Sequence, residues 1–360
     1  MNEIPYQDTG LAFLTDDTGL LQHGKYHVPD PRHGYSTDDN ARALILAVRL
    51  YEKMPDPRYR QWIYRYAGFL LGAQNPNGRF RNFMNYDRRW LEKEGSADCT
   101  GRCIWGISEA LVSPAVSIGV KKMLASLLAK ALPAVSSLEF VKSQAYALLG
   151  LAALLRHKEI MHAWSDGWAA GGAEQVKGST DLEAVAAELS KKLLQSWDAA
   201  QDGDWHWFED VLTYSNAMVP WALLRYAAAT GQEEARQVGL AALDFLAIRT
   251  IRQEIFYPIG CQGWWPKTAA VGAVFDQQPL EAFEMMAACQ EADRLTGEHR
   301  YKTMARVAFA WYEGRNIIGQ SMIDPDTGGC FDGITVSGVN ENLGAESQIA
   351  WGLACMAGDS

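Results

Sequence analysis

Six segments of this chain of 360 residues open with small, polar or acidic residues and then continue as an almost wholly apolar stretch. The apolar residues follow the spacing of a helix and not the alternation of a strand. A helix that is apolar nearly all round is buried on all sides. The pattern therefore predicts six buried helices, which begin near Ser36, Ser96, Lys142, Thr213, Asp276 and Gly344.

Helices of a second kind lie between the buried ones. Each has a polar, charged face and an apolar face, which is typical of a helix that covers a core from outside. They are expected at 57–73, 117–132, 181–197, 233–249 and 299–314. The alternation of buried and amphipathic helices predicts an inner ring of helices inside an outer one, so the expected fold class is all-α, an (α/α)6 toroid.

The repeat also predicts the domain organisation. The shortest interval between successive buried segments runs from Ser96 to Lys142 and the longest from Lys142 to Thr213, each about the length of one helical hairpin. Six such units occupy residues 35–360, which we expect to form a single toroid domain, although the length alone also allows two domains. Residues 1–34 are rich in Gly, Pro and Asp and predict an extended arm with turns that closes the ring.

Charge and hydropathy exclude several classes of partner. The 43 Asp and Glu residues outnumber the 33 Lys and Arg residues, and the formal net charge of -10 argues against nucleic acid or an anionic membrane as the main partner. No apolar run is long enough to cross a bilayer, and the first residues lack the pattern of a secretory signal. The six Cys residues include no C-x-x-C pair, and most lie in apolar segments, so we expect a reduced, cytoplasmic setting.

Long linkers join each outer helix to the next inner one, at 74–95, 156–180, 198–212, 250–275 and 315–343. Loops of such length in a compact domain are usually functional. In the predicted ring they emerge on the face where the inner helices begin, which is the candidate site. They carry aromatic side chains that are able to stack on sugar rings and that we expect to be exposed: Tyr86, Trp90, Trp164, Trp168, Trp205, Trp207, Phe208, Phe256, Tyr257, Trp264 and Trp265.

Five carboxylates at this face are the catalytic candidates. Hydrolysis of a glycosidic bond needs one carboxyl group to protonate the leaving oxygen and a second to activate water, and the two lie roughly 6.5–9.5 Å apart in inverting enzymes. The candidates are Asp39, Asp98, Glu209, Asp276 and Glu346. The sequence does not select a pair among them.

A wider set is expected to bind the substrate through amides, charges and aromatic faces. Some of its members also have a structural interpretation: Ser36 and Asp39 fit a capping box, Asp276 fits an N-cap before Pro279, and the aromatics around Glu209 fit a clamped loop. The binding candidates are Tyr35, Asp38, Asn40, Arg42, Tyr86, Trp90, Arg102, Trp205, Trp207, Asp210, Tyr214, Asn216, Trp264, Trp265, Gln277, Gln278, Asn340 and Asn342.

Metal and nucleotide chemistry are not expected. His23 and His27 are four residues apart, but Gly24 and Pro29 disfavour the helix that a metal-binding pair would need. The D-x-D-x-G run from Asp324 lacks the later ligands of an EF-hand and predicts a turn. Adjacent acids such as Asp38 and Asp39 also occur in magnesium-dependent isoprenoid enzymes, but the amides and Trp residues around them favour a sugar. Phosphate-cradling glycine motifs and a nucleophile elbow are absent from the sequence, so we expect neither a metal nor an organic cofactor.

Several stretches, in order, resemble a bacterial toroid module that occurs alone or fused C-terminal to group 1 glycosyltransferases, often near mannoside-processing proteins. They are LTDDTGLLQHGKYHVPDPRHGYSTDDNARALI, FMNYDRRW with GSADCTGR, WHWFEDVLTYSNA, FDQQPLEA, and TGGCFDG with GVNENLGAES, and they cover the chain from Leu14 to its end. The resemblance implies a fold like that of the six-hairpin glycosidases and a carbohydrate ligand, but no catalytic pair. The module tends to have Asp where this chain has Ser215 and an acid where it has Ala97, so neither position is expected to be indispensable.

We therefore expect a glycoside hydrolase that acts by inversion on an oligosaccharide such as a mannoside. Two alternatives stay open. One is a carbohydrate-binding or regulatory module that serves a glycosyltransferase without chemistry of its own. The other is a sugar epimerase or isomerase, which commonly relies on histidine as a proton shuttle, and only His206 lies beside a candidate carboxylate. The sugar, the linkage, exo or endo action and the oligomeric state do not follow from the sequence.

Overall fold

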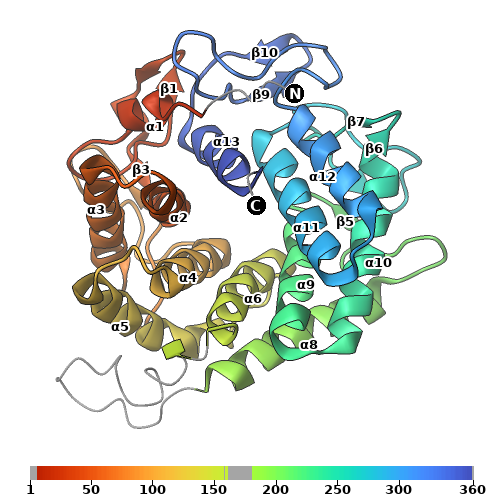
Figure 1. The fold of residues 1–360 in the computed structure, drawn as a ribbon, viewed down its shortest axis with the longest axis horizontal. Helices are drawn as coiled ribbons and strands as arrows, with labels where there is room; N and C mark the ends of the chain where they lie inside the picture. The colour runs from red at the N-terminus through yellow and green to blue at the C-terminus, as the bar shows by residue number, and fades with distance from the viewer. Residues whose placement is uncertain (1–5, 158, 161–180, 359–360) are drawn as a thin grey trace.

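The computed structural model describes residues 6–157, 159–160 and 181–358. In this part of the chain, long helices form a ring around a common axis (Figure 1). Each inner helix packs against the next, and the last packs against the first, so the ring is closed. The inner helices are α2 (Thr37–Lys53), α4 (Ala97–Val112), α6 (Val141–Leu155), α9 (Met218–Thr230), α11 (Pro279–Thr296) and α13 (Ala345–Gly358). The predicted all-α (α/α)6 toroid is confirmed.

An outer layer of helices covers the inner ring. Each outer helix packs against the inner helix that it neighbours in sequence, as α3 does against α2 and α12 against α11. The outer helices are α3 (Pro57–Ala73), α5 (Ile118–Val135), α8 (Leu182–Ala200), α10 (Glu233–Thr250) and α12 (His299–Ala310). Each begins within one residue of its predicted start. Only α12 ends clearly early, because a turn occupies residues 311–314.

The N-terminal arm contains a helix that the sequence did not predict. Helix α1 (Thr9–Leu14) buries Leu11 and Leu14 and packs against α13, where a sixth outer helix would stand. The rest of the arm is irregular and includes the antiparallel pair β1 (Gly24–Lys25) and β2 (Val28–Pro29) and the 3-10 helix η1 (Pro31–His33). The boundary at residue 34 between arm and toroid stays a prediction.

Short antiparallel strand pairs shape the connections between helices. Strand β3 (Tyr35–Ser36) pairs with β4 (Phe83–Met84), and β5 (Val211–Leu212) with β8 (Trp265–Pro266). Strand β6 (Ile251–Arg252) pairs with β7 (Ile255–Phe256), and β9 (Gly333–Thr335) with β10 (Gly338–Asn340). These pairs tie the linkers to one another and to the segment just before α2.

Two predicted inner-helix starts need correction. Helix α9 begins at Met218 and not near Thr213, because the preceding residues form β5 and Ser215 adopts a positive φ of 49°. The N-cap of α11 is Gln278 and not Asp276, and Pro279 occupies the first helical position, where its missing N–H costs nothing. The predicted N-cap at Ser36 is confirmed, and Ser96 caps α4 in the same way, since each side chain accepts a backbone N–H three residues on.

The inner helices are buried around their whole circumference. Every residue of α6 from Val141 to Leu154 is buried, including Lys142 and Gln144 at its start. The six Cys residues are all free, and Cys99, Cys103, Cys289 and Cys330 are buried as small hydrophobic side chains. None of the helices in the described ranges is both long enough and apolar enough to span a membrane.

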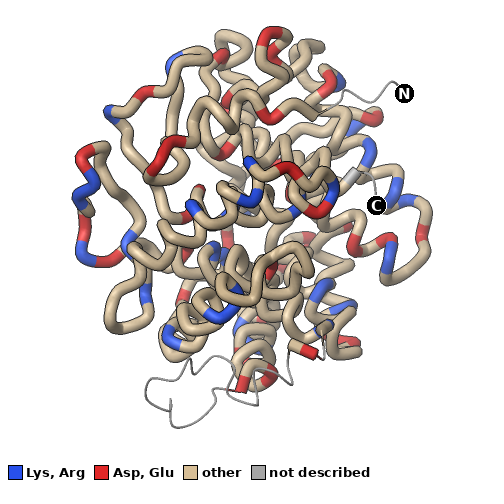
Figure 2. The backbone as a smooth tube through the Cα atoms, turned by 60° about the vertical axis from the view of Figure 1, so that its left-hand side comes forward, with Lys and Arg blue, Asp and Glu red and all other residues tan. Residues whose placement is uncertain are grey.

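The outer surface carries charges of both signs. Figure 2 shows acidic and basic residues interspersed along the loops and outer helices of the side that it draws. Among the described residues visible there, no continuous basic stripe runs across that side.

Glycines allow neighbouring inner helices to approach closely. A Cβ atom on Gly150 of α6 would lie 2.7 Å from the Cα atom of Trp105 and 2.9 Å from the carbonyl oxygen of Ile104, both in α4. A Cβ atom on Gly68, in outer helix α3, would have no atom within 4 Å. Only the first position therefore requires glycine for packing.

We predict that Gly150→Ala lowers the free energy of unfolding by about 1–3 kcal/mol, because α4 and α6 must move apart to make room for the methyl group. Gly68→Ala should instead raise it by about 0.5–1 kcal/mol, as expected for an uncrowded helical position. Urea denaturation of both variants measures the difference. Equal stabilities for the two variants would contradict the close contact between α4 and α6.

Candidate functional site

A cavity of about 400 Å³ lies at the end of the ring where inner helices begin. The starts of α2, α4 and α13 and the segment before α11 contribute to its wall, which is mostly polar. It brings together three catalytic candidates, Asp39, Asp276 and Glu346. It also brings together the binding candidates Asp38, Arg42, Arg102, Gln277, Gln278 and Asn340.

The other two catalytic candidates do not line this cavity. Asp98 lies at the start of α4 and accepts a hydrogen bond from the hydroxyl of Tyr214. Glu209 forms an ion pair with the buried Lys142, with 3.1 Å between Oε2 and Nζ. Both carboxylates therefore serve contacts on the α4–α6–α9 side of the ring.

Four binding candidates make hydrogen bonds that hold segments of the chain together. Asn40 accepts the N–H of Leu20 at 3.0 Å and donates to the carbonyl of Ser36, so it fixes the arm to α2. Asn216 exchanges hydrogen bonds with the backbone of residue 213, and Asn342 accepts the N–H of residue 26. Tyr35 is buried, and its hydroxyl donates to Asp16.

Most linker aromatics are not exposed, contrary to the prediction. Trp205, Trp207, Phe208, Phe256 and Trp265 are buried. Those around Glu209 pack on the outer helices, as Phe208 does on Trp197 and Trp207 on Phe245. The clamped-loop interpretation of this segment therefore describes its packing.

The remaining aromatic and charged candidates lie near the surface. Tyr86 is 57% exposed, whereas Trp90, Tyr257 and Trp264 are half-buried, and Asp210 is exposed beside Lys267. Trp164 and Trp168 lie outside the described residues. Phe83, which was not a candidate, lines the cavity and is 41% exposed.

Ser36 joins two neighbouring carboxyl groups at the cavity. Its Oγ lies 2.9 Å from Oδ1 of Asp38, forms a still shorter contact with Oδ2 of Asp39, and accepts the N–H of Asp39 at 3.2 Å. A hydroxyl has one hydrogen and can donate to only one acceptor. A proton on one of the two carboxyls would let both contacts with Oγ be hydrogen bonds.

Electrostatics assigns that proton to Asp39. Burial, and after it the negative charge of Asp38, raises the pKa of Asp39 to about 7, although Arg42 acts in the opposite direction. Burial also disfavours the charge on Asp38, but Arg102 and Arg42 outweigh it and hold the pKa of Asp38 below its ordinary value. Near neutral pH Asp38 is therefore ionised, while Asp39 is in part still protonated.

Two arginines link this pair to the rest of the ring. Arg42 contacts Oδ1 of Asp39 at 2.7 Å and Oε2 of Glu346 at 2.9 Å, which connects α2 to α13. Arg102 contacts Oδ2 of Asp38 at 2.8 Å and donates to the hydroxyl of Tyr146 at 3.0 Å. These charge-assisted contacts fix both carboxyls in position.

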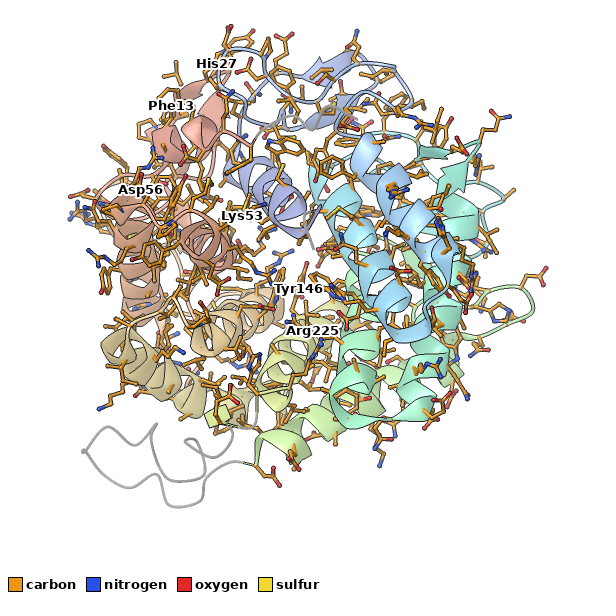
Figure 3. All side chains as sticks on the ribbon, viewed as in Figure 1. Phe13, His27, Lys53, Asp56, Tyr146 and Arg225 are labelled. Atoms are coloured by element: carbon orange, nitrogen blue, oxygen red, sulfur yellow. The ribbon has the colours of Figure 1, made fainter. Side chains whose placement is uncertain are left out.

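The network continues inward to residues that were not predicted. The hydroxyl of Tyr146 lies 2.6 Å from Oγ of Ser215, and the backbone N–H groups of Ser215 and Asn216 donate to Glu281. Burial raises the pKa of Glu281 to about 7. Figure 3 shows Tyr146 between the inner helices near the ring axis.

Glu284 lies one turn after Glu281 on α11 and is fully buried. Neither of its carboxyl oxygens has a hydrogen-bond partner among the described residues. Burial, and next the charge of Glu281, raises the pKa of Glu284 well above its ordinary value, so Glu284 is neutral. The sequence did contain a signal for these residues, namely two acids three apart in a helix that is otherwise apolar.

Asp332 is another acid of the cavity wall that was not predicted. Its Oδ1 accepts the N–H of Gly344 at 2.6 Å and the hydroxyl of Ser347, so it holds the start of α13. Burial raises its pKa. It comes from a linker whose folding the sequence pattern does not specify.

A group with metal-ligand chemistry lies outside this cavity. Ligand atoms of His27, Asp324 and Asp326 lie within 4.8 Å of one another. However, the carboxylate of Asp324 already accepts hydrogen bonds from the backbone of Asp326 and Thr327 and from the hydroxyl of Thr327. The turn that was predicted at Asp324 explains this group.

No family model matches the chain, and no curated protein sequence matches it. Solved structures share its fold. A cellobiose 2-epimerase from Bacillus thermoamylovorans has a TM-score of 0.69 at 11% identity over 98% of this chain and 96% of that one. The GH76A α-1,6-mannanase from Salegentibacter sp. has a TM-score of 0.61 at 10% identity over 98% and 96%. A GH76 α-mannanase from Bacteroides thetaiotaomicron has 0.59 at 10% over 90% and 85%.

We predict that Glu281 makes stability depend on pH. The folded chain keeps this proton up to about pH 7, whereas the unfolded chain loses it near the ordinary value of 4.5. The folded state therefore binds more protons in this window, and the free energy of unfolding falls as pH rises, by up to about 1.4 kcal/mol per pH unit. Glu281→Gln should make this decrease shallower, while the raised pKa values of Asp39, Glu284 and Asp332 keep the rest of it.

Urea denaturation between about pH 5 and about pH 7 measures both slopes. The control is Glu139→Gln, because Glu139 is exposed and should not affect the slope. If the Glu281→Gln variant and the unsubstituted protein give parallel plots of stability against pH, then Glu281 ionises as an ordinary glutamate and the assigned proton is wrong.

Proposed function

We propose that the protein is a glycoside hydrolase for an oligosaccharide such as a mannoside, with Asp39 as the general acid. The observation that carries this proposal is the contact of Ser36 with both Asp38 and Asp39 at the wall of a large polar cavity, where the pKa of Asp39 is raised and that of Asp38 is lowered. Neighbouring carboxyls with opposite protonation preferences are typical of acid and base assignments in glycosidases.

Asp39 has the properties that a general acid needs. Because its pKa is raised to about 7, a substantial fraction of Asp39 still holds a proton near neutral pH, which it can give to the leaving oxygen of a glycosidic bond. Arg42, 2.7 Å from its Oδ1, then stabilises the carboxylate that forms. Glu346 contacts the same guanidinium and keeps it in position.

We assign the general base to Asp276. It lines the same cavity from the segment before α11, two helices away from α2 around the ring. Its Oδ2 accepts a hydrogen bond from Gln262, and its Oδ1 has no partner among the described residues. Asp38 and Glu346 are engaged in contacts with arginines, whereas Asp276 has no such contact in the described part of the chain.

The stereochemical outcome distinguishes two carboxyl pairs. Asp38 and Asp39 contact the same hydroxyl, so their nearest oxygens are closer than the roughly 6.5–9.5 Å of an inverting pair. Retention would fit Asp39 with Asp38 as nucleophile, whereas inversion would need a more distant partner, the role that we propose for Asp276. NMR of the first-formed anomer from a mannooligosaccharide should show inversion, and retention would overturn the assignment of Asp276.

We predict that Asp39→Asn and Asp276→Asn each lower kcat/KM at least about a hundredfold on a hydrolysed mannooligosaccharide, as expected for loss of a general acid or base. Both variants should remain folded by circular dichroism. The matched control is Asp198→Asn on the exposed face of α8, which should keep full activity. Full activity in both cavity variants would contradict the proposal.

A sugar epimerase is the second candidate, and one residue favours it. His23 lines the cavity and packs edge-on against His33, with 4.8 Å between ring centroids, so it could shuttle a proton. His206, the histidine considered from the sequence, instead stacks on Trp197 and does not line the cavity. A new sugar isomer without new reducing ends would identify epimerisation.

Association with a glycosyltransferase, a role limited to sugar binding and a cytoplasmic location all stay predictions. A role limited to sugar binding differs from hydrolysis because it yields no product. Calorimetry that detected oligosaccharide binding, together with no product after prolonged incubation, would favour a binding module over either enzyme.

A further inference from the structure

A second cavity, of about 210 Å³, lies at the opposite end of the ring. Residues from the C-terminal halves of inner helices line it, including Arg49 of α2, Arg225 of α9 and Arg294 of α11, and Arg156 joins them from the end of α6. It shares no lining residue with the cavity that contains Asp39. Figure 3 shows Arg225 inside the ring near its axis.

Two buried glutamates organise these arginines. Glu109 contacts Arg49 at 3.2 Å and forms a shorter contact with Arg225, while Nε1 of Trp105 donates to it at 3.2 Å. At the other side, Glu291 contacts Arg156 at 3.4 Å and Arg294 at 2.9 Å. Each glutamate thus holds two guanidinium groups at the cavity.

The arrangement leaves an excess of positive charge. Four arginines face two glutamates, so two positive charges are not neutralised within the group. Within the described residues, each of these guanidinium groups uses one nitrogen atom for its hydrogen bond to a glutamate, so further N–H donors are available. Guanidinium groups are well suited to bind phosphate oxygens in pairs.

Compensation of helix dipoles explains only part of this charge. A cation in the last turn of a helix is stabilised by the carbonyl groups there, which suits Arg156 and Arg294. Arg49 and Arg225, however, lie at least a full turn before the last residues of α2 and α9. Their position favours a contact with something inside the cavity.

We propose that this cavity binds a small phosphate ester with two negative charges. The four arginines would hold the phosphate group, and the net charge of the group would be balanced. The aromatic side chains of Trp105, Trp221 and Phe283 also line the cavity and provide an apolar wall for the organic part of the ligand. The proposal is independent of the reaction proposed for the other cavity.

Isothermal titration calorimetry of the full chain with glucose 6-phosphate and with inorganic phosphate tests this proposal. Glucose 6-phosphate should bind with a Kd below about 1 mM, and its affinity should fall as salt screens the charges. Binding of both probes would show that the phosphate group alone is recognised, and binding of glucose 6-phosphate alone would show that the organic part also contributes. If neither probe binds, the proposal is wrong.

Two variants test the location of the site. Arg225→Gln and Arg294→Gln should each weaken glucose 6-phosphate binding at least about tenfold. Arg294 is about half-exposed, so its variant keeps the test valid even if loss of the more buried Arg225 impairs folding. Arg236→Gln, on outer helix α10, is the matched control and should bind normally.

Asp39→Asn separates the two cavities. It should bind glucose 6-phosphate like the unsubstituted protein, because Asp39 does not line the arginine-rich cavity. Normal binding in both arginine variants, or loss of binding in Asp39→Asn alone, would assign the probe to the other cavity and overturn the proposal. Neither result depends on whether the protein hydrolyses sugars.

Discussion

The inner helices are buried on all sides, and this constraint determines where the chain can carry chemistry. A charge in the middle of such a helix must find a partner, since an unpaired buried charge is costly. Polar groups therefore gather at the two ends of the ring, where cavities admit water and ligands. Glu284, in the second turn of α11, is an exception. Like Glu281 in the first turn, it keeps a proton more readily than an exposed glutamate because burial disfavours the charged form.

Acidic and basic side chains lie at opposite ends of the inner helices. Acids such as Asp38 and Asp39 lie at helix N-termini, where backbone N–H groups favour negative charge. Arginines such as Arg156 and Arg294 lie near helix C-termini, where carbonyl groups favour positive charge. Because every inner helix of a closed hairpin ring points the same way, these preferences add up to an acidic end and a basic end.

The sequence predicted the features that depend on local pattern. The outer helices follow the amphipathic period, so their starts were found within one residue. The N-cap at Ser36 was found because a short polar side chain before an apolar run satisfies a free N–H group. Helix α1 was missed because a six-residue helix among Gly, Pro and Asp residues has little pattern of its own.

Features that depend on distant contacts were not predictable. Trp207 and Trp265 lie in linkers, and only the outer helices and strands that they meet determine that they are buried. Five acids were expected at one site, but partners such as Lys142 and Tyr214 draw Glu209 and Asp98 away from the cavity. The spacing of apolar residues along a helix indicates which of its faces is buried. It does not indicate which side chains come into contact across the ring.

The central claim is that Asp39 keeps a proton beside an ionised Asp38. A titration of the two carboxyl carbons by ¹³C NMR tests this claim most directly. Asp39→Asn and Asp38→Asn variants assign the two signals. The account predicts that Asp39 titrates near pH 7, while Asp38 stays ionised to below the ordinary value of 3.8. If both carboxyls titrate near 3.8, neither holds a proton at neutral pH, and the assignment of Asp39 as the general acid is wrong.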